Sequence, residues 1–257
     1  MNNRNIICLI LFSVILLSCN KREKIVQYYP SGKLKAEGYL VNGEKDGIAK
    51  SYFENGRIKE VGLWKENKQE GKWEYNNENG RLSKSANFKN NFQDGQTRIY
   101  YDNDSLKELS NWKDGQLNGE SFLYYENGKI KEFFNWRHNK KEGTSKTYYE
   151  GGALQQIGNW INNLQNGRFI TLYPNGDTLQ VGSYKIGKKT GLFRSYYENG
   201  NLLSDVTYKE DIQDGNSIYY FDNGNIEQRG DFTKGKPIGE WVFYNKNGSL
   251  KKTKIFE

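Results

Sequence analysis

Glycine recurs every 24 residues along most of this chain. Nine positions follow this spacing without an insertion or deletion between them: Gly47, Gly71, Gly95, Gly119, Gly143, Gly167, Gly191, Gly215 and Gly239. A fixed period of this length indicates a repeat architecture, in which each unit buries its apolar residues against its neighbours. With a degenerate first unit that begins at Glu23, the sequence holds ten copies. We therefore expect one elongated array.

Each unit carries two turn signals about twelve residues apart. The first is an Asn-Gly pair such as Asn55-Gly56, which accepts positive φ at both central residues and so predicts a two-residue type I′ hairpin. The second turn has Gly, Asn or Asp at one fixed position, as in Asn67 and Gly115, and these residues enter the left-handed region at low cost. Turn formers at this spacing exclude helix as the main structure. The predicted fold class is all-β, an elongated single array of about ten 24-residue antiparallel β-hairpin repeats.

Two rows of side chains repeat with the glycines. An aliphatic residue such as Ile58 follows Asn-Gly by two positions, and a ring such as Trp64 follows six positions later. Because alternate residues of a strand share a face, both belong to one side of the sheet. This ring row is predicted to be core, and it consists of Trp64, Phe88, Trp112, Trp136, Trp160, Tyr184, Tyr208, Phe232 and Phe256. A second aromatic row, in pairs such as Tyr124-Tyr125 before the Asn-Gly turn, is left open between core and an exposed surface.

The composition favours a folded protein without catalytic machinery. Hydrophobic residues make up 35% of the chain and aromatic residues 15%, too many rings for a disordered segment. The chain has one histidine, His138, and two cysteines within the first 19 residues, which excludes a Cys/His zinc cluster, a Ser-His-Asp triad and a disulfide framework. Asp46, Glu70 and equivalent acids in later units recur about 10 Å apart, too far to share a calcium ion. We expect no enzyme, metal or cofactor.

The N-terminus is typical of an exported, lipid-anchored protein. Residues 1–18 combine Arg4 with a short apolar run, as in a signal peptide. The run ends in Leu-Leu-Ser followed by Cys19, which resembles the bacterial lipobox and implies acylation of that cysteine. We therefore expect residues 19–27 to form a lipidated N-terminus and short tether, and residues 28–257 to form the array. The expected location is the bacterial cell envelope, at the outer membrane if the host has two membranes.

The repeat unit itself resembles a known family. The run Tyr-Tyr-Glu-Asn-Gly-Lys-Ile-Lys at 124–131, followed by small-x-aromatic triplets such as Gly62-Leu63-Trp64, is similar to the bacterial variant of the MORN repeat. The resemblance covers residues 28–257 and implies an elongated stack of antiparallel β-hairpins. Bacterial arrays of this variant are often labelled antitoxins of the YwqK type, a cytoplasmic role that conflicts with an exported N-terminus.

The candidate binding surface combines the tyrosine row with two basic rows that follow Asn-Gly. It comprises Tyr100, Tyr124, Tyr148, Tyr196, Lys33, Lys35, Arg57, Lys59, Arg81, Lys107, Lys129 and Lys131. Basic rows suit an acidic protein surface or anionic head groups, and exposed tyrosines suit sugar rings. We predict a non-enzymatic binding or scaffolding protein whose partners are the lipid bilayer, through acylated Cys19, and a protein or an envelope glycan. Binding of a carbohydrate or envelope polymer and an antitoxin-like role are the alternatives. Export makes nucleic acid an unsuitable partner.

Overall fold

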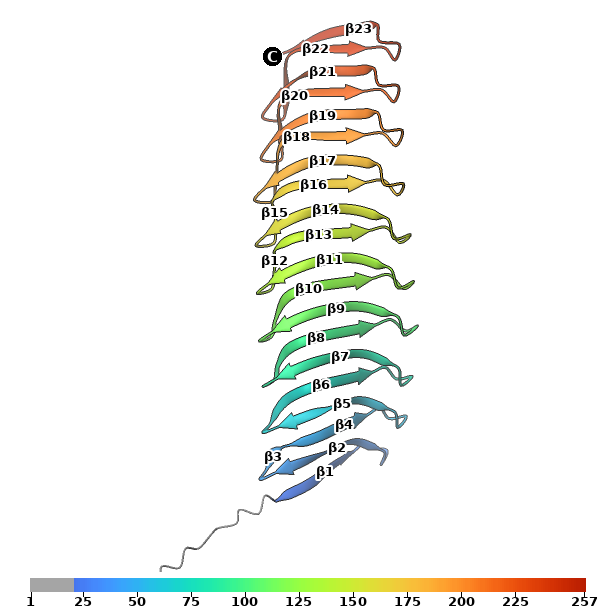
Figure 1. The fold of residues 1–257 in the computed structure, drawn as a ribbon, viewed down its shortest axis with the longest axis vertical. Helices are drawn as coiled ribbons and strands as arrows, with labels where there is room; N and C mark the ends of the chain where they lie inside the picture. The colour runs from blue at the N-terminus through green and yellow to red at the C-terminus, as the bar shows by residue number, and fades with distance from the viewer. Residues whose placement is uncertain (1–20) are drawn as a thin grey trace, which may run out of the picture.

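The computed structural model describes residues 21–257, and the segment expected to be a signal peptide, together with Cys19, lies outside the described residues. Every described element is a β-strand, and all 23 strands belong to one sheet (Figure 1). The strands are β1 (Arg22–Tyr28), β2 (Leu34–Val41), β3 (Glu44–Lys45), β4 (Gly47–Tyr52), β5 (Ile58–Lys65), β6 (Lys68–Asn76), β7 (Leu82–Lys89), β8 (Phe92–Tyr100), β9 (Leu106–Lys113), β10 (Gln116–Tyr124), β11 (Ile130–Arg137), β12 (Lys140–Lys141), β13 (Gly143–Tyr148), β14 (Leu154–Ile161), β15 (Leu164–Gln165), β16 (Gly167–Leu172), β17 (Thr178–Lys185), β18 (Lys188–Tyr196), β19 (Leu202–Lys209), β20 (Ile212–Tyr220), β21 (Ile226–Thr233), β22 (Lys236–Tyr244) and β23 (Leu250–Phe256).

Each strand pairs antiparallel with the strands before and after it, so the chain climbs the stack one hairpin at a time (Figure 1). The two-residue strands β3, β12 and β15 are the first parts of β4, β13 and β16, interrupted by one residue, and share their partners β2, β11 and β14. Ten hairpins result, as the sequence predicts. All-β architecture as a single antiparallel array is confirmed.

The array begins earlier than residue 28. Strand β1 starts at Arg22, which pairs with Val41, and the ladder continues through Ile25 opposite Gly38. Residues 22–27, expected to be part of a tether, therefore form the first strand of the stack. Their backbone groups have a partner in β2 although few of their side chains are buried, and the weak apolar pattern of REKIVQ hid this pairing.

The Asn-Gly segments do not form the two-residue type I′ turns that the sequence predicts. In the loop 53–57, Phe53 O accepts the N–H of Gly56 at 2.9 Å and Phe53 N donates to Arg57 O at 2.8 Å. Among these residues only Gly56 has positive φ, 85°, and the Asn55 side chain accepts the N–H of Arg57 at 3.0 Å. Because asparagine closes the turn with its side chain, the left-handed conformation falls to glycine alone, as in a type I turn followed by a bulge.

The type I′ turns lie at the opposite edge of the sheet. Between β5 and β6, Glu66 and Asn67 both have positive φ, 48° and 61°, the combination that defines this turn. Asn67 also binds strand β3, since its N–H donates to Lys45 O at 3.0 Å and its Oδ1 accepts the N–H of Lys45 at 2.8 Å. The nine residues predicted to be left-handed all have positive φ: Gly43, Asn67, Asn91, Gly115, Asn139, Asn163, Gly187, Asp211 and Gly235.

The period-24 glycines mark bulges that face the ring row. Gly71, with φ of 64°, lies where the β5–β6 register shifts, and across β7 it pairs with Phe88. The same pairing joins Gly119 to Trp136. A residue with a Cβ would be strained at these angles, and an opposing ring can cover the bare backbone. The glycine row and the ring row therefore recur together in the sequence because each glycine pairs with a ring on the neighbouring strand.

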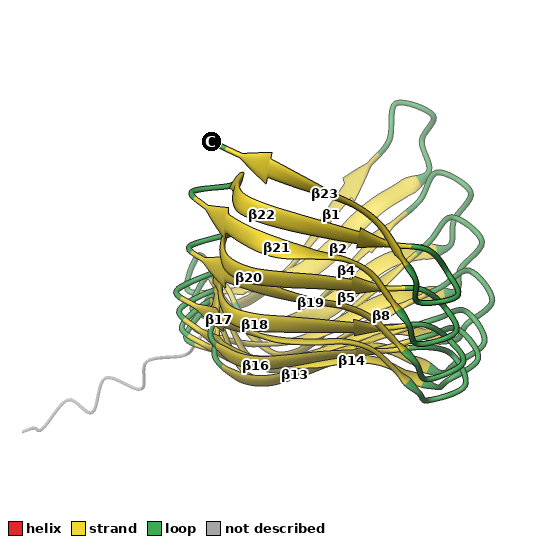
Figure 2. Cartoon of the chain, turned by 90° about the horizontal axis from the view of Figure 1, so that it is seen from above, coloured by secondary structure: helices red, strands yellow, loops and turns green. Residues whose placement is uncertain are grey.

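The single-layered sheet has two different faces. We call the side that bears Trp64 and Trp73, whose rings meet at 5.4 Å, the ring face. The opposite side, where Phe122 contacts both Phe133 and Tyr124, is called the tyrosine face. Figure 2 shows that the strands bow and that the stack turns progressively along its axis. Across residues 21–257 there is no helix long and apolar enough to cross a bilayer.

Candidate binding surface

The centre of the ring face is a line of alternating large and small residues. Gly62 lies against Trp73, and Gly230 lies against Trp241, so closely that an added Cβ would be 2.1 Å and 2.4 Å from the indole. Gly158 and Gly182 meet Phe169 and Phe193 in the same way. These four rings are 3–4% exposed, and each buried side chain of this size contributes on the order of 2 kcal/mol.

In the middle of the array, serine takes the place of the inserted ring. Trp136 Nε1 donates to Ser121 Oγ at 2.6 Å, and Trp160 Nε1 donates to Ser145 Oγ at 2.7 Å. Trp112 Nε1 instead donates to Ser110 Oγ at 3.0 Å, and Ser110 stands at the position that Gly62 has in its own strand. A buried indole N–H needs an acceptor. Where the central line has serine, the serine hydroxyl accepts the hydrogen bond from the tryptophan of the ring row.

The sequence pattern predicts a core formed by the Trp64 row but does not predict the inserted rings of the central line, which are Trp73, Phe169, Phe193 and Trp241. The available signal was the glycine in triplets such as Gly62-Leu63-Trp64, which marks a socket for an aromatic residue of the next strand. The socket and its ring are eleven residues apart, so the pairing emerges only when the register is known.

The predicted tyrosine row lies on the tyrosine face and is half-buried. Tyr100, Tyr124, Tyr148 and Tyr196 each end the first strand of a hairpin. Tyr124 stacks on Phe122, with ring centroids 6.3 Å apart, and burial raises the pKa of its hydroxyl. The row is therefore neither fully core nor free, which resolves the alternatives that the sequence left open.

Along the centre of this face runs an apolar segment between charged ends. Leu109 pairs with Phe122, which pairs with Phe133. Beyond the intervening Lys146, Ile157 pairs with Ile170 and Ile170 with Val181. We define the apolar patch as Leu109, Phe122, Phe133, Ile157, Ile170 and Val181. Toward the N-terminus the same line continues as Glu74, Ser85 and Arg98, and toward the C-terminus as Arg194 and Asp205, which form an ion pair at 2.9 Å.

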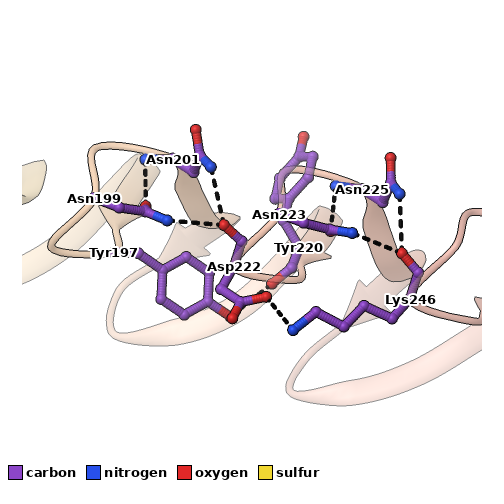
Figure 3. Close-up of polar contacts among 8 residues, drawn as sticks. All are labelled: Tyr197, Asn199, Asn201, Tyr220, Asp222, Asn223, Asn225 and Lys246. Carbon is purple, nitrogen blue, oxygen red and sulfur yellow. Dashed lines mark hydrogen bonds and ion pairs between the residues drawn. The ribbon is translucent and has the colours of Figure 1, made fainter.

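The second tyrosine of each pair links neighbouring hairpins. Tyr125 Oη donates to Tyr148 O at 2.8 Å, and Tyr197 Oη donates to Tyr220 O at 2.8 Å (Figure 3). The same bond recurs at Tyr29, Tyr101, Tyr149 and Tyr173, with distances between 2.6 and 2.8 Å. This ladder satisfies carbonyls where the strands end, as buried or half-buried backbone groups require.

Asparagine side chains form a parallel ladder along the Asn-Gly edge. Asn199 Nδ2 and Asn201 Nδ2 both donate to Asp222 O at 2.9 Å, and one hairpin further Asn223 and Asn225 donate to Lys246 O at 2.8 and 3.0 Å (Figure 3). Each loop is thereby fixed to the next. The Asn-Gly pair therefore serves both turn formation and contact between repeats.

The predicted basic rows lie on this same edge and are exposed, but most of their members are engaged within the array. Arg57 and Arg81 each donate through Nη1 to a carbonyl of the next loop, and Lys129 Nζ donates to Gly151 O at 2.7 Å. Four others, Lys35, Lys59, Lys107 and Lys131, hold their ammonium groups 5.4–5.9 Å above the rings of Tyr29, Phe53, Tyr101 and Tyr125. Lys33 is exposed without such a contact among the described residues.

The repeated acids serve the turns. Glu70 Oε2 accepts the N–H of Asn90 at 3.1 Å, and Glu142 Oε2 accepts the N–H of Asn162 at 3.1 Å. Asp94 binds Lys113 Nζ at 2.8 Å, which holds the pKa of its carboxyl below the ordinary range. Residues 21–257 contain no group of three His, Cys, Asp or Glu side chains placed to hold a metal ion. His138 lies exposed in a type I′ turn.

A single-layer sheet built by one hairpin unit, tied by ladders that repeat every unit, defines an antiparallel β-hairpin repeat array. The chain belongs to the MORN repeat variant family. The family model matches more than half of it, in eight segments: residues 24–42, 45–66, 69–90, 93–114, 117–132, 141–162, 189–210 and 213–234. The hairpins β16–β17 and β22–β23 fall largely outside these segments although they keep the same geometry.

Three solved structures resemble this one weakly. The Photorhabdus luminescens Tc holotoxin pore is 13% identical with a TM-score of 0.23, over 86% of this chain and 14% of that chain. A TcdB2-TccC3-Cdc42 complex gives 12% and 0.21, over 90% and 13%, and a porin-like protein from Bacteroides uniformis gives 9% and 0.19, over 91% and 94%. Scores this low carry no argument about function. No curated protein matches the chain.

Proposed function

We propose that this protein is a non-enzymatic scaffold of the bacterial envelope that binds a partner protein on its tyrosine face. The observation that carries the proposal is the apolar patch on that face. Phe122 and Phe133 meet at 5.1 Å at its centre, and none of its six side chains is buried. All described elements belong to one layer, so no second layer of residues 21–257 covers them. Apolar surface rimmed by polar residues is typical of protein–protein sites.

The charges around the patch suit an interface. Lys146 lies within it, between Phe133 and Ile157, while Arg98 and the Arg194–Asp205 pair lie at its ends. A polar rim adds orientation and specificity to an apolar centre. A rigid sheet also loses little conformational entropy on binding, because its hairpins are already fixed by their neighbours.

Anchoring through Cys19 completes the proposal. A diacylated and N-acylated cysteine at the start of the mature chain would hold the array at a membrane, since more than one acyl chain is needed for a stable anchor. Strand β1 begins three residues after Cys19, so the array would start close to the bilayer. Labelled palmitate should enter the wild type and not Cys19→Ala, and equal labelling of both would contradict the anchor.

The binding face is tested by site-specific photocrosslinking in cells. A crosslinking residue at Lys146, on the tyrosine face, should yield a discrete protein adduct, whereas the same residue at Gln156, on the ring face, should not. The adduct should disappear when Phe122 and Phe133 are both changed to serine, while thermal unfolding confirms that the array is intact. Adducts from Gln156 alone would assign binding to the other face.

An envelope glycan is the second candidate partner. The hydroxyls of Tyr100, Tyr124 and Tyr148 make no hydrogen bond to residues 21–257, and the three rings repeat once per hairpin. Aromatic rings with free hydroxyls can stack on sugars and hydrogen-bond to them. Purified peptidoglycan should then retain the wild type and lose Tyr124→Ala. The matched control is Leu172→Ala, at the aliphatic position of the same row, and equal retention of both variants would exclude this role.

A further inference from the structure

The first three hairpins leave a groove on the ring face. Its volume is about 190 Å³, and it is lined by Ile25, Ala36, Gly38, Ala49, Trp64 and Trp73 among others. A site of this size suits one aromatic ring, since a cavity of about 150 Å³ lined by apolar side chains accommodates benzene. The groove lies on the face opposite the apolar patch and is independent of it.

The groove exists because one socket in the array has no ring. Gly62, Gly158, Gly182 and Gly230 each receive an aromatic side chain from the next strand. Gly38 occupies the same position of its hairpin, but the next strand supplies Ala49, whose Cβ is 3.4 Å from where a Gly38 Cβ would be. The first hairpin thus has the socket glycine, but the next strand has alanine where the later strands have an aromatic residue.

Two polar groups beside this socket have also lost their partners. Trp136 and Trp160 donate to the serine fifteen residues before them, but that position is Ala49 for Trp64. The other five indole N–H groups of the chain have acceptors in the protein, and that of Trp64 has none among residues 21–257.

Ser51 is the second such group. In later hairpins Gln156 and Gln180 donate to Thr171 and Ser195, each across one strand pair. Ser51 pairs with Ala36 instead, and its enclosed Oγ has no partner in the protein. An enclosed hydroxyl without a partner is costly unless a ligand or water satisfies it.

We propose that this groove binds an aromatic side chain of a partner polypeptide, which fills the socket over Gly38 as the array's own rings fill the others. The tryptophan and phenylalanine rings that occupy the four filled sockets indicate the size and shape accepted. A peptide carries ring and carbonyl acceptors together, so the Trp64 N–H and the Ser51 hydroxyl would bind its backbone. Lys45, whose Nζ lies 4.5 Å from the Trp64 ring centroid, borders the site.

The test titrates the protein with N-acetyl-L-tryptophanamide and follows the Gly38 amide and the Trp64 Nε1–H by two-dimensional NMR. Both signals should shift saturably, with a dissociation constant roughly in the millimolar range expected for a ligand this small. N-acetyl-L-leucinamide, which is apolar without a ring, should bind at least tenfold more weakly. Equal binding of the two probes, or no saturable shift with either, would overturn the proposal.

Two variants and one control variant test whether the probe binds in the groove. Ala49→Phe supplies the omitted ring and should abolish binding while it maintains or raises the melting temperature. Ile48→Phe adds the same ring one residue away, at a side chain that is 57% exposed on the other face, and should bind like the wild type. Trp64→Phe keeps a ring but removes the donor and should weaken binding several-fold without loss of fold. Undiminished binding by Ala49→Phe would contradict the assignment. Because the apolar patch is untouched by these variants, the crosslinking result at Lys146 is independent of this outcome.

Discussion

The indole of Trp73 covers Gly62 so closely that a Cβ on Gly62 would lie 2.1 Å from the ring. Trp73 is 3% exposed and also meets Trp64 and Phe88 edge-on at 5.4 and 6.4 Å. The ring therefore joins three consecutive strands. Contacts of this kind, rather than a separate layer, give a one-layered sheet its core.

Gly62→Ala should destabilise the array. The added methyl group has no space under a ring that is held on both sides, and overpacking of this kind costs about 1–3 kcal/mol. Gly38→Ala is the matched control, because its Cβ would meet Ala49 at an ordinary 3.4 Å, and it should be neutral or slightly stabilising. Urea unfolding measures both free energies, and equal effects of the two substitutions would refute the socket interpretation.

Tyr125→Phe should weaken the tyrosine ladder. It removes the hydrogen bond to Tyr148 O at 2.8 Å and leaves that half-buried carbonyl unpaired, at a cost of about 0.5–1.5 kcal/mol. Tyr148→Phe removes a hydroxyl that has no partner among the described residues and should cost much less. The ladder has a natural gap at Phe221, so Phe221→Tyr should add a bond to Tyr244 O and raise stability. Indistinguishable stabilities for the variants at 125 and 148 would exclude a structural role for the ladder.

The 24-residue pattern predicts the hairpin count, the left-handed turn residues and the Trp64 row, because these depend on spacing within one repeat. It does not reveal the interactions between repeats. Arg57 and Lys129 look like free binding residues in sequence, yet they donate to carbonyls 21 and 22 residues further on. The predicted turn type of the Asn-Gly segments is also wrong, because the Asn55 side chain accepts a hydrogen bond within its own loop. Binding residues and structural residues share a row here, and only their contacts distinguish them.

The first two hairpins should lose stability in acid through Glu37. Its carboxylate binds Lys24 Nζ at 2.8 Å and accepts a hydrogen bond from Tyr52 Oη at 2.7 Å. Lys24, followed by Tyr52, holds the pKa of Glu37 below its ordinary value of 4.5. A folded-state pKa lower than the unfolded one adds stability above the unfolded value, and that contribution is lost as the pH falls through the folded value.

Glu37→Gln isolates this effect. The amide still accepts a hydrogen bond from Tyr52 but cannot titrate, so the wild type should be more stable at neutral pH and the difference should vanish well below pH 4.5. The contribution is small because the ion pair is partly exposed, and salt should reduce it further. Melting temperatures between roughly pH 3 and pH 6 measure the difference. A gap between the two proteins that does not change with pH would contradict the linkage.

At alkaline pH, Tyr52 should make the stability of the array fall as the pH rises, which is the opposite of the trend caused by Glu37. Burial, and next the hydrogen bond to Glu37, raises the pKa of Tyr52 from 10.0 to about 12. Because the folded state keeps this proton longer than the unfolded state does, the contribution is complete below pH 10.0 and is lost as the pH rises toward about 12. Tyr52→Phe should flatten the fall in stability over that window. An unchanged slope in the variant would show that other tyrosines cause the fall.

Hydrogen exchange should be slowest in the middle of the array and faster toward both ends. An inner hairpin is covered by neighbours on both sides, whereas each terminal hairpin has one open edge. The ends already show the difference, because Tyr28 and Leu250 are 63% and 61% exposed, although the equivalent Tyr52 and Ile58 of inner strands are half-buried. In a linear array, local opening at an end breaks one interface and opening in the centre breaks two.

Exchange followed by mass spectrometry should therefore give protection that rises from β1 and β23 toward β11–β14. Removal of the last hairpin, residues 235–257, should shift the fast-exchanging edge inward to β20–β21. Uniform protection along the chain would instead indicate that the array unfolds as a single cooperative unit.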